Sequence, residues 1–145
     1  MNTTASTDTY PRQYSRTQRL SLGEPRNITI SPDGQSVLFL RSRSGSDPVN
    51  CLWHLDVASK KETLIADPLI MLGGSDDQDL PPAEKARRER LREGAGGITA
   101  YSTDAQAQRF TCSLGGRLFI GETSAPLTRE ITTTSLVFDP RLSPD

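Results

Sequence analysis

The stretch NITISPDGQSVLFLR, residues 27–41, contains the motif that decides the fold. Its turn, Ser31–Gly34, separates the short apolar segment 27–30 from the apolar block Val37–Leu40. Proline at the second turn position fixes φ, aspartate can bond to nearby backbone, and glycine accepts a positive φ. The pattern predicts a β-hairpin in which residues 27–30 pair antiparallel with residues 35–43.

Two more strands are expected after this hairpin. Residues 51–57 alternate in character, with one face made by Trp53, Leu55 and Val57 and the other by Leu52, His54 and Asp56. A turn at 58–61 leads to residues 62–66, which suit a short strand that ends before Pro68. Residues 20–66 are therefore predicted to form one four-stranded antiparallel meander.

The same plan occurs again in residues 98–134. Expected strands at 98–102, 109–114, 117–120 and 129–132 are separated by turns at 103–106 and at Gly115-Gly116. The last three residues, Ser143-Pro-Asp145, repeat the Ser31-Pro-Asp33 turn letter for letter. Residues 135–145 are therefore predicted to begin a third copy of the unit.

The spacing of the units favours a β-propeller over a generic β-sandwich. Ser143 follows Ser102 by 41 residues, whereas Ser102 follows Ser31 by 71. Without an insertion of about 30 residues the period matches the roughly 40 to 45 residues of four-stranded propeller blades. The fold class is predicted as all-β: an incomplete propeller over residues 20–145, with about two blades and the start of a third.

The predicted insertion, residues 67–97, carries one short helix and two charged clusters. Proline at 81 and glycine at 94 are suitable boundaries for a helix over 81–93. We interpret the acidic residues of the preceding loop as solvated and not as calcium ligands, since the EF-hand spacing is absent. The basic residues of the helix alternate with glutamates and are expected to form a solvated face. These two clusters are Asp76, Asp77 and Asp79, and Arg87, Arg88, Arg90 and Arg92.

Composition limits the classes of partner. The chain has 34% hydrophobic and 24% charged residues, as in a globular protein, and its net charge of −1 provides no basic field for nucleic acid. Residues 1–19 have no apolar run long enough for a signal peptide or a membrane span and are expected to be a flexible segment. We expect a cytoplasmic protein that binds neither nucleic acid nor membrane and needs no cofactor.

No catalytic or metal-binding residue is predicted in the chain. It contains no Gly-x-Ser-x-Gly elbow, and its single histidine, His54, lies in the middle of an expected strand. Cys51 and Cys112 lack CxxC spacing and are interpreted as small buried residues. The glycine pairs at 96–97 and 115–116 are interpreted as turns, and packing between blades is the expected role of Trp53, Phe110, Leu114, Leu118 and Phe119.

Several segments together resemble the N-terminal propeller region of bacterial dipeptidyl peptidase IV-like enzymes of the prolyl oligopeptidase superfamily. They are ITISPDG at 28–34, LPPAEKARRERLRE at 80–93, GGITAY at 96–101 and FDPRLSPD at 138–145. The similarity covers roughly residues 20–145. The Ser-Pro-Asp-Gly turn is common among propellers, but the helix between the first two blades and the final motif make the joint match more specific.

The resemblance implies a serine peptidase in which the propeller covers a C-terminal α/β-hydrolase domain and narrows the access of peptide substrates. No triad or amine-binding glutamate motif of that family matches this chain. We therefore expect a structural and substrate-gating part of a longer peptidase, inactive alone and poorly soluble or oligomeric. One alternative is a non-enzymatic propeller, similar to the TolB-like repeats, that acts as a platform for protein interactions. Another is a small sheet that functions by pairing with another copy, against which the exposed edges and faces of an unclosed ring argue.

Overall fold

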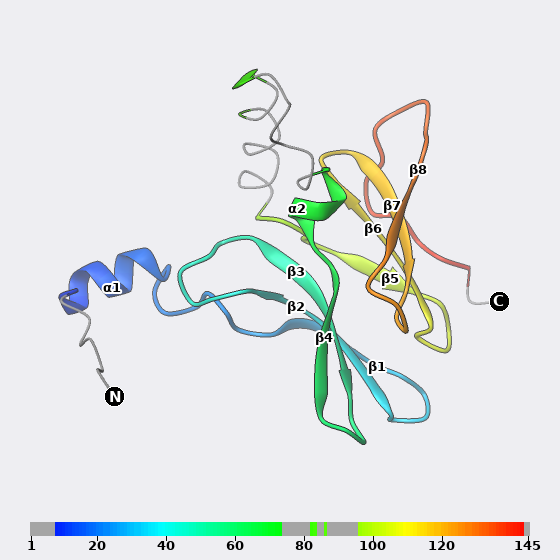
Figure 1. Ribbon diagram of the computed structural model, residues 1–145, viewed down its shortest axis with the longest axis horizontal. Coiled ribbons are helices and arrows are strands. Elements are labelled where there is room, and N and C mark those ends of the chain that lie inside the picture. The colour runs from blue at the N-terminus through cyan, green and yellow to red at the C-terminus, as the bar shows by residue number, and fades with distance from the viewer. Residues whose placement is uncertain (1–7, 74–81, 84–85, 87–95, 144–145) are drawn as a thin grey trace.

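A computed structural model describes residues 8–73, 82, 83, 86 and 96–143, and its described residues form two antiparallel sheets of four strands each (Figure 1). Sheet A contains β1 (Arg26–Ile30), β2 (Ser36–Ser42), β3 (Asn50–Asp56) and β4 (Lys61–Ala66). Sheet B contains β5 (Tyr101–Thr103), β6 (Arg109–Leu114), β7 (Arg117–Glu122) and β8 (Thr128–Ile131). Each sheet is a meander whose strands lie in sequence order, so the all-β prediction is confirmed.

The first hairpin of each sheet has a connection of the same length, five residues, at 31–35 and 104–108. In sheet A the Ser31 N–H donates to the Ser36 carbonyl at 2.9 Å, and in sheet B the Asp104 N–H donates to the Arg109 carbonyl at 3.2 Å. The fourth loop residue has a positive φ in both, +70° at Gly34 and +56° at Ala107. The Ser31–Gly34 turn was predicted from its glycine, whereas alanine gives no such signal.

The junction between the sheets explains why β5 is shorter than predicted. Ile98 was expected to begin this strand, but its N–H donates to the Asn50 carbonyl at 3.0 Å, at the start of β3. Asn50 in turn donates its N–H to the Gly96 carbonyl at 2.8 Å, which makes a parallel bridge between the segment and sheet A. Ile98 is fully buried there, so tertiary packing takes priority over continuation of the strand.

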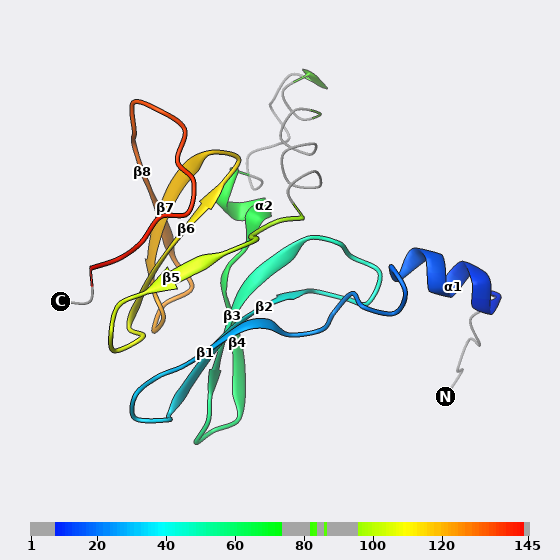
Figure 2. The same cartoon turned by 180° about the vertical axis from the view of Figure 1, so that it is seen from behind.

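Two short helices were not predicted. Helix α1 (Tyr10–Arg16) lies within the segment expected to be flexible and extends away from both sheets in Figures 1 and 2. Helix α2 (Pro68–Met71) begins where β4 ends, and the Asp67 side chain accepts the Leu69 N–H at 3.0 Å. None of the helices among the described residues is long and apolar enough to cross a membrane.

Parts of the predicted insertion and third unit can be compared with the structure. Pro82, Ala83 and Ala86 are helical, and the rest of the helix predicted over 81–93 lies outside the described residues. Residues 135–143 follow sheet B without forming a strand, and the Val137 N–H donates to the Gly116 carbonyl at 2.8 Å.

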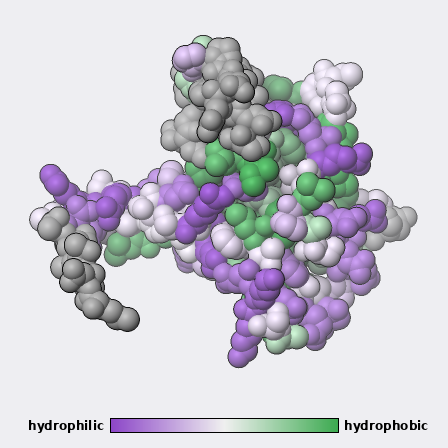
Figure 3. Space-filling model, in the orientation of Figure 1, coloured by the Kyte–Doolittle hydropathy of each residue, from purple (hydrophilic) through white to green (hydrophobic). Residues whose placement is uncertain are grey.

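A single hydrophobic core joins the two sheets. It includes Leu38, Leu40, Leu52 and Ile65 from sheet A, Met71 and Leu72 from the α2 segment, Ile98, and Phe110, Cys112, Leu114 and Phe119 from sheet B. In Figure 3, hydrophobic surface gathers around α2 and along the junction of the sheets, whereas the free hairpin ends of sheet A are hydrophilic. The sheets therefore pack face to face and share one core.

Candidate interaction faces of the two sheets

The strand registers define equivalent positions in the two sheets. Ile30 pairs with Val37 just before and after the first loop, as Thr103 pairs with Phe110, so Val37 corresponds to Phe110. The next two strands continue the match, because the pair Phe39–Trp53 corresponds to Cys112–Phe119. Sequence alignment of the units would not reveal this, since the β2–β3 and β6–β7 connections differ in length.

We name the two faces of each sheet from these correspondences. The front face contains Val37, Phe39 and Trp53 in sheet A and their counterparts Phe110, Cys112 and Phe119 in sheet B. The back face contains Leu38, Leu40 and Leu52 in sheet A and their counterparts Thr111, Ser113 and Leu118 in sheet B. These names apply throughout.

The core joins the back of sheet A to the front of sheet B. Leu38, Leu40 and Leu52 are at most 2% exposed, and the front residues of sheet B that meet this core are as deeply buried. Unlike faces are therefore in contact, which is a head-to-tail arrangement of two similar units. The front of sheet A and the back of sheet B are left without a partner sheet in the described part of the chain.

Tyr101 fixes the relative position of the sheets. Its side chain extends from β5 to the back of sheet A, where the hydroxyl lies 2.9 Å from Thr29 Oγ1 and 3.0 Å from the Leu38 carbonyl oxygen. Burial raises the pKa of this hydroxyl above its usual value, so the group stays protonated and can donate. This polar link lies beside the shared apolar core, against which Tyr101 packs.

Gly121 leaves room for the Phe110 ring on the front of sheet B to lie against β7. A Cβ at this position would lie 2.6 Å from Phe110 Cζ, closer than side-chain carbons approach. Its counterpart in sheet A, at the same register position, is Leu55. The smaller residue occurs on the face that is packed against another sheet.

The front of sheet A is apolar and in part exposed. Ile28 and Ile30 on β1 are 61% and 64% exposed, and Val37, Trp53, Leu55 and Leu64 are half-buried. The Arg41 guanidinium lies over Trp53 and Phe39, 4.6 and 5.3 Å from their ring centres, and pairs with Glu62 at 2.6 Å. Stacking of arginine on aromatic rings is favourable and covers part of the apolar surface.

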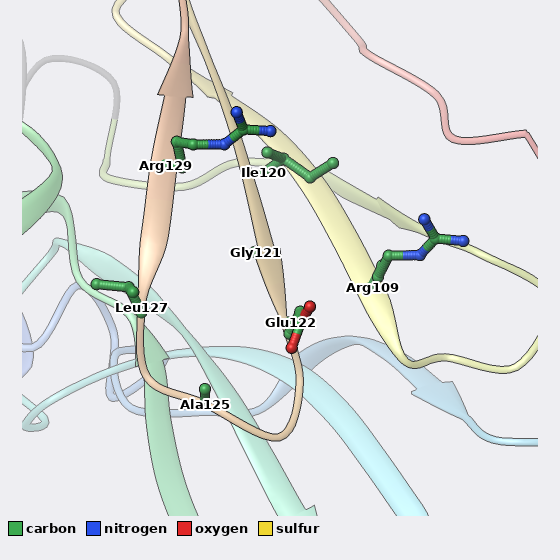
Figure 4. A pocket seen from close by; sticks show the side chains of 7 residues that line it. All are labelled: Arg109, Ile120, Gly121, Glu122, Ala125, Leu127 and Arg129. Carbon is green, nitrogen blue, oxygen red and sulfur yellow. The ribbon is translucent and has the colours of Figure 1, made fainter.

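The back of sheet B carries a shallow cavity of about 480 Å³ (Figure 4). Seven residues line it, and three of them are charged. They are Arg109, Ile120, Gly121, Glu122, Ala125, Leu127 and Arg129. Arg109 pairs with Asp104 at 3.4 Å, whereas Arg129 makes no ion pair within the described ranges. Figure 4 shows the side chains of Arg129 and Ile120 next to each other on this face.

His54 was predicted to be a strand residue, and the structure places it half-buried in β3, 3.0 Å from Ser36 Oγ. A catalytic pair would need a third group to orient the imidazole. The nearby Asp56 carboxylate instead accepts the N–H groups of Ala58 and Ser59, and these bonds, above all those of Ser59, lower its pKa. Ser36 and His54 therefore form a structural contact that the sequence pattern did not reveal.

Both cysteines are buried, as predicted, and neither forms a disulfide within the described part of the chain. Burial raises the pKa of the Cys112 thiol to about 12, so it is unreactive at neutral pH. Among the described residues no three His, Cys, Asp or Glu side chains are grouped as a metal site would require. The acidic residues 76, 77 and 79 and the basic residues 87, 88, 90 and 92 lie outside the described ranges.

The predicted packing residues divide between the core and the two uncovered faces. Phe110, Leu114 and Phe119 are buried between the sheets, as expected. Trp53 and Leu118 are half-buried on the front of sheet A and the back of sheet B, outside the shared core. Comparison of the chain with models of known protein families finds no match.

Proposed function

We propose that the chain supplies two neighbouring blades of a β-propeller in a dipeptidyl peptidase IV-like serine peptidase, where it has a structural and substrate-gating role. The head-to-tail packing of two equivalent sheets is the observation that supports this most strongly. A sandwich made from two copies of one unit about a two-fold axis would bring like faces together. Contacts between unlike faces can instead be repeated until a ring closes.

A backbone detail agrees with the third unit expected from the sequence. Asn27 precedes the Ser31-Pro turn by four residues and has a φ of +50°, and Asp139 precedes Ser143-Pro by four residues with a φ of +47°. Positive φ is uncommon outside glycine, and asparagine and aspartate adopt it most readily. The same unusual conformation at the same distance from the same motif favours a repeated unit.

The peptidase assignment depends on the resemblance of residues 28–34, 80–93, 96–101 and 138–145 to that family. The described residues contain no orienting group for His54, and the sequence contains no nucleophile elbow. Cleavage would therefore be performed by an α/β-hydrolase domain outside the 145 residues, with the propeller controlling which peptides reach it.

The test uses the natural gene product. An antibody raised against the isolated chain would be used to purify the endogenous polypeptide, and its mass and its hydrolysis of Ala-Pro and Gly-Pro p-nitroanilide would be measured. We expect a polypeptide longer than 145 residues that releases p-nitroaniline and is inhibited by a serine-directed phosphonate. The isolated chain, used as the control, is expected to release none.

A longer polypeptide that has no peptidase activity and no Gly-x-Ser-x-Gly segment by mass spectrometry would contradict the peptidase assignment. That result would favour the interaction platform. Hydrolysis by the purified 145-residue chain would contradict the assignment of a purely structural and gating role.

A further inference from the structure

We propose that the Arg19–Leu20 peptide bond is a processing site, at which an arginine-specific endopeptidase of the trypsin class separates residues 1–19 from the two sheets. The bond lies in the connection between α1 and β1. The inference does not depend on the peptidase assignment, because the enzyme that cuts this bond is a separate protein.

The residues before the bond are not packed against the sheets. No residue of α1 is buried, and the helix extends away from both sheets in Figures 1 and 2. Every hydrogen bond that residues 9–21 make in the described part of the chain lies within residues 8–22. Contact with the β2–β3 connection comes after the bond, where a Cβ at Gly23 would lie 3.5 Å from the Gly45 Cα. Cleavage therefore removes none of the hydrogen bonds that hold the sheets.

The backbone around the bond has an unusual conformation. Gln18, Arg19 and Leu20 have φ values of +48°, +65° and +63°. Residues with a side chain enter this left-handed region singly and at a cost in free energy, so three in succession store strain. All three are exposed, so no packing compensates this cost. Opening of the turn to an extended conformation releases the strain and is therefore easier than opening of an unstrained turn.

Two hydroxyl groups hold the turn closed. Thr17 Oγ1 donates to the Gln13 carbonyl at 2.6 Å and accepts the Leu20 N–H at 2.9 Å. Ser21 Oγ donates to the Gln18 carbonyl at 2.6 Å. Each of these bonds joins residues at most four positions apart, so the turn can open while both sheets stay folded. An endopeptidase binds such an opened segment, and exposed connections near a chain terminus are common sites of cleavage.

The side chain at the bond suits this class of enzyme. Trypsin binds arginine through a carboxylate in its specificity pocket. Arg19 is exposed and has no ion pair among the described residues, whereas Arg16 pairs with Asp8 at 2.7 Å and Arg26 lies in β1. In the net reaction water is consumed and the C–N bond breaks. The Arg19 carbonyl carbon gains the oxygen of a carboxylate, and the nitrogen becomes the amino group of Leu20.

The first experiment measures cleavage of the 145-residue chain by trypsin at a low ratio of enzyme to substrate. Mass spectrometry follows the released peptide 1–19 itself, so cuts elsewhere in the chain do not affect the measurement. Arg19→Gln removes the recognised side chain, and Arg26→Gln in β1 is the matched control. We expect the peptide from the unmodified chain and from Arg26→Gln, and none from Arg19→Gln.

A second variant distinguishes a closed turn from a tail that is merely exposed. Thr17→Val keeps the shape of the side chain but removes the hydroxyl that accepts the Leu20 N–H. The open form should be more populated, and release of the peptide 1–19 about two- to ten-fold faster. Synthetic peptides of residues 12–24, with and without the same substitution, correct for any preference of trypsin at position 17.

In the natural gene product, processing should leave Leu20 as the amino-terminal residue. The endogenous polypeptide, purified with the antibody described above, is sequenced from its amino terminus. An intact Arg19–Leu20 bond in that polypeptide would overturn the proposal, whether or not the polypeptide hydrolyses the dipeptide reporters. A folded chain that resists trypsin while the peptide 12–24 is cut would also overturn it. So would equal corrected rates for Thr17→Val and the unmodified chain, since the turn would then not control access.

Discussion

Gly97 shows how one residue determines where the two sheets meet. Its φ is +76°, and a Cβ there would overlap the Asn50 backbone oxygen and lie 2.6 Å from the Asn50 nitrogen and 2.9 Å from Val49 Cγ1. Backbone atoms paired in a bridge cannot move away at low cost. The residue is therefore required both for its conformation and for its lack of a side chain.

Gly97→Ala is predicted to destabilise the fold more than Gly34→Ala. Both glycines have a positive φ, but a Cβ at Gly34 meets no atom within 4 Å, so that variant experiences only the conformational cost of about 1–2 kcal/mol. The steric overlap at Gly97 should add a further cost on the order of 1–3 kcal/mol. Urea unfolding measures both variants, and equal losses would contradict the proposed close approach of Gly97 to Asn50.

The Cys112 thiol should make stability depend on pH in the alkaline range. Its pKa is raised from 9.0 in the unfolded chain to about 12 in the folded one by burial. The contribution of the neutral thiol to the free energy of unfolding is fully present below pH 9. It is lost progressively as the pH rises from 9 towards 12, because the thiol of the unfolded state releases its proton first.

The free energy of unfolding of the unmodified chain should therefore decrease more steeply between pH 8 and pH 10 than that of Cys112→Ala. Tyr101, whose pKa is also raised, is present in both proteins and contributes equally to the two curves. Parallel curves would show that Cys112 is accessible to solvent.

At the scale of elements, the hairpin loops depend on short polar networks. Ser31 Oγ donates to Asp33 Oδ1 at 2.5 Å and accepts the Ser36 N–H at 2.9 Å, and Asp33 also accepts the Gln35 N–H. In sheet B the Asp104 carboxylate accepts the N–H groups of Gln108 and Arg109. Two different sequences therefore close the same loop with a carboxylate that bonds to backbone N–H groups.

Ser31→Ala is predicted to raise the pKa of Asp33 towards 3.8. The bond from Ser31 is the main cause of the lowered pKa, and the bond from the Gln35 N–H is the next. Because the folded pKa is lowered, the contribution of Asp33 to stability is present above the unfolded pKa and lost as the pH falls through the folded one. An NMR titration of the carboxyl carbon measures the shift, and an unchanged pKa would mean that the serine does not hold the carboxylate.

The strands could be predicted from the sequence, but the first and last residues of several strands could not. Alternation and turn residues gave both meanders, including the Gly115-Gly116 hairpin and the strand Arg109–Leu114. Ile98 was assigned to β5 because the residues next to it in sequence have a strand pattern. The bridge that holds this segment to Asn50 joins parts of the chain far apart in sequence, which a local pattern does not show. Helices α1 and α2 are too short for a helical period to be recognised.

At the scale of the whole molecule, the sequence did not show which face of each sheet is packed against the other sheet. Trp53 and Phe110 were both expected to pack between blades, but only the register shows that Trp53 lies on the uncovered front of sheet A. The cation–π contact of Arg41 with Trp53 has only a weak signal in the sequence. Arg41 follows Phe39 by two residues in β2, which places both on one face, but Trp53 belongs to another strand. A residue can be assigned to one face of a sheet only from the pairing of its strand with the neighbouring strands, and the sequence alone does not give that register.

Tyr101→Phe is predicted to weaken the connection between the sheets. The variant keeps the ring but removes the only donor that reaches Thr29 Oγ1 and the Leu38 carbonyl from β5 among the described residues. A loss of about 1–2 kcal/mol in the free energy of unfolding is expected, because partly buried acceptors lose a hydrogen-bond partner. Tyr14→Phe on α1 is the control, and an equal effect of both changes on thermal unfolding would contradict this role of Tyr101.

The head-to-tail packing of the two sheets is tested most directly by NMR measurement of nuclear Overhauser effects between their side chains. Effects should join the methyl groups of Leu38, Leu40 and Leu52 to the side chains of the sheet B core, and Tyr101 to Thr29. Effects that join Trp53 to its counterpart Phe119 would place like faces together and contradict the account.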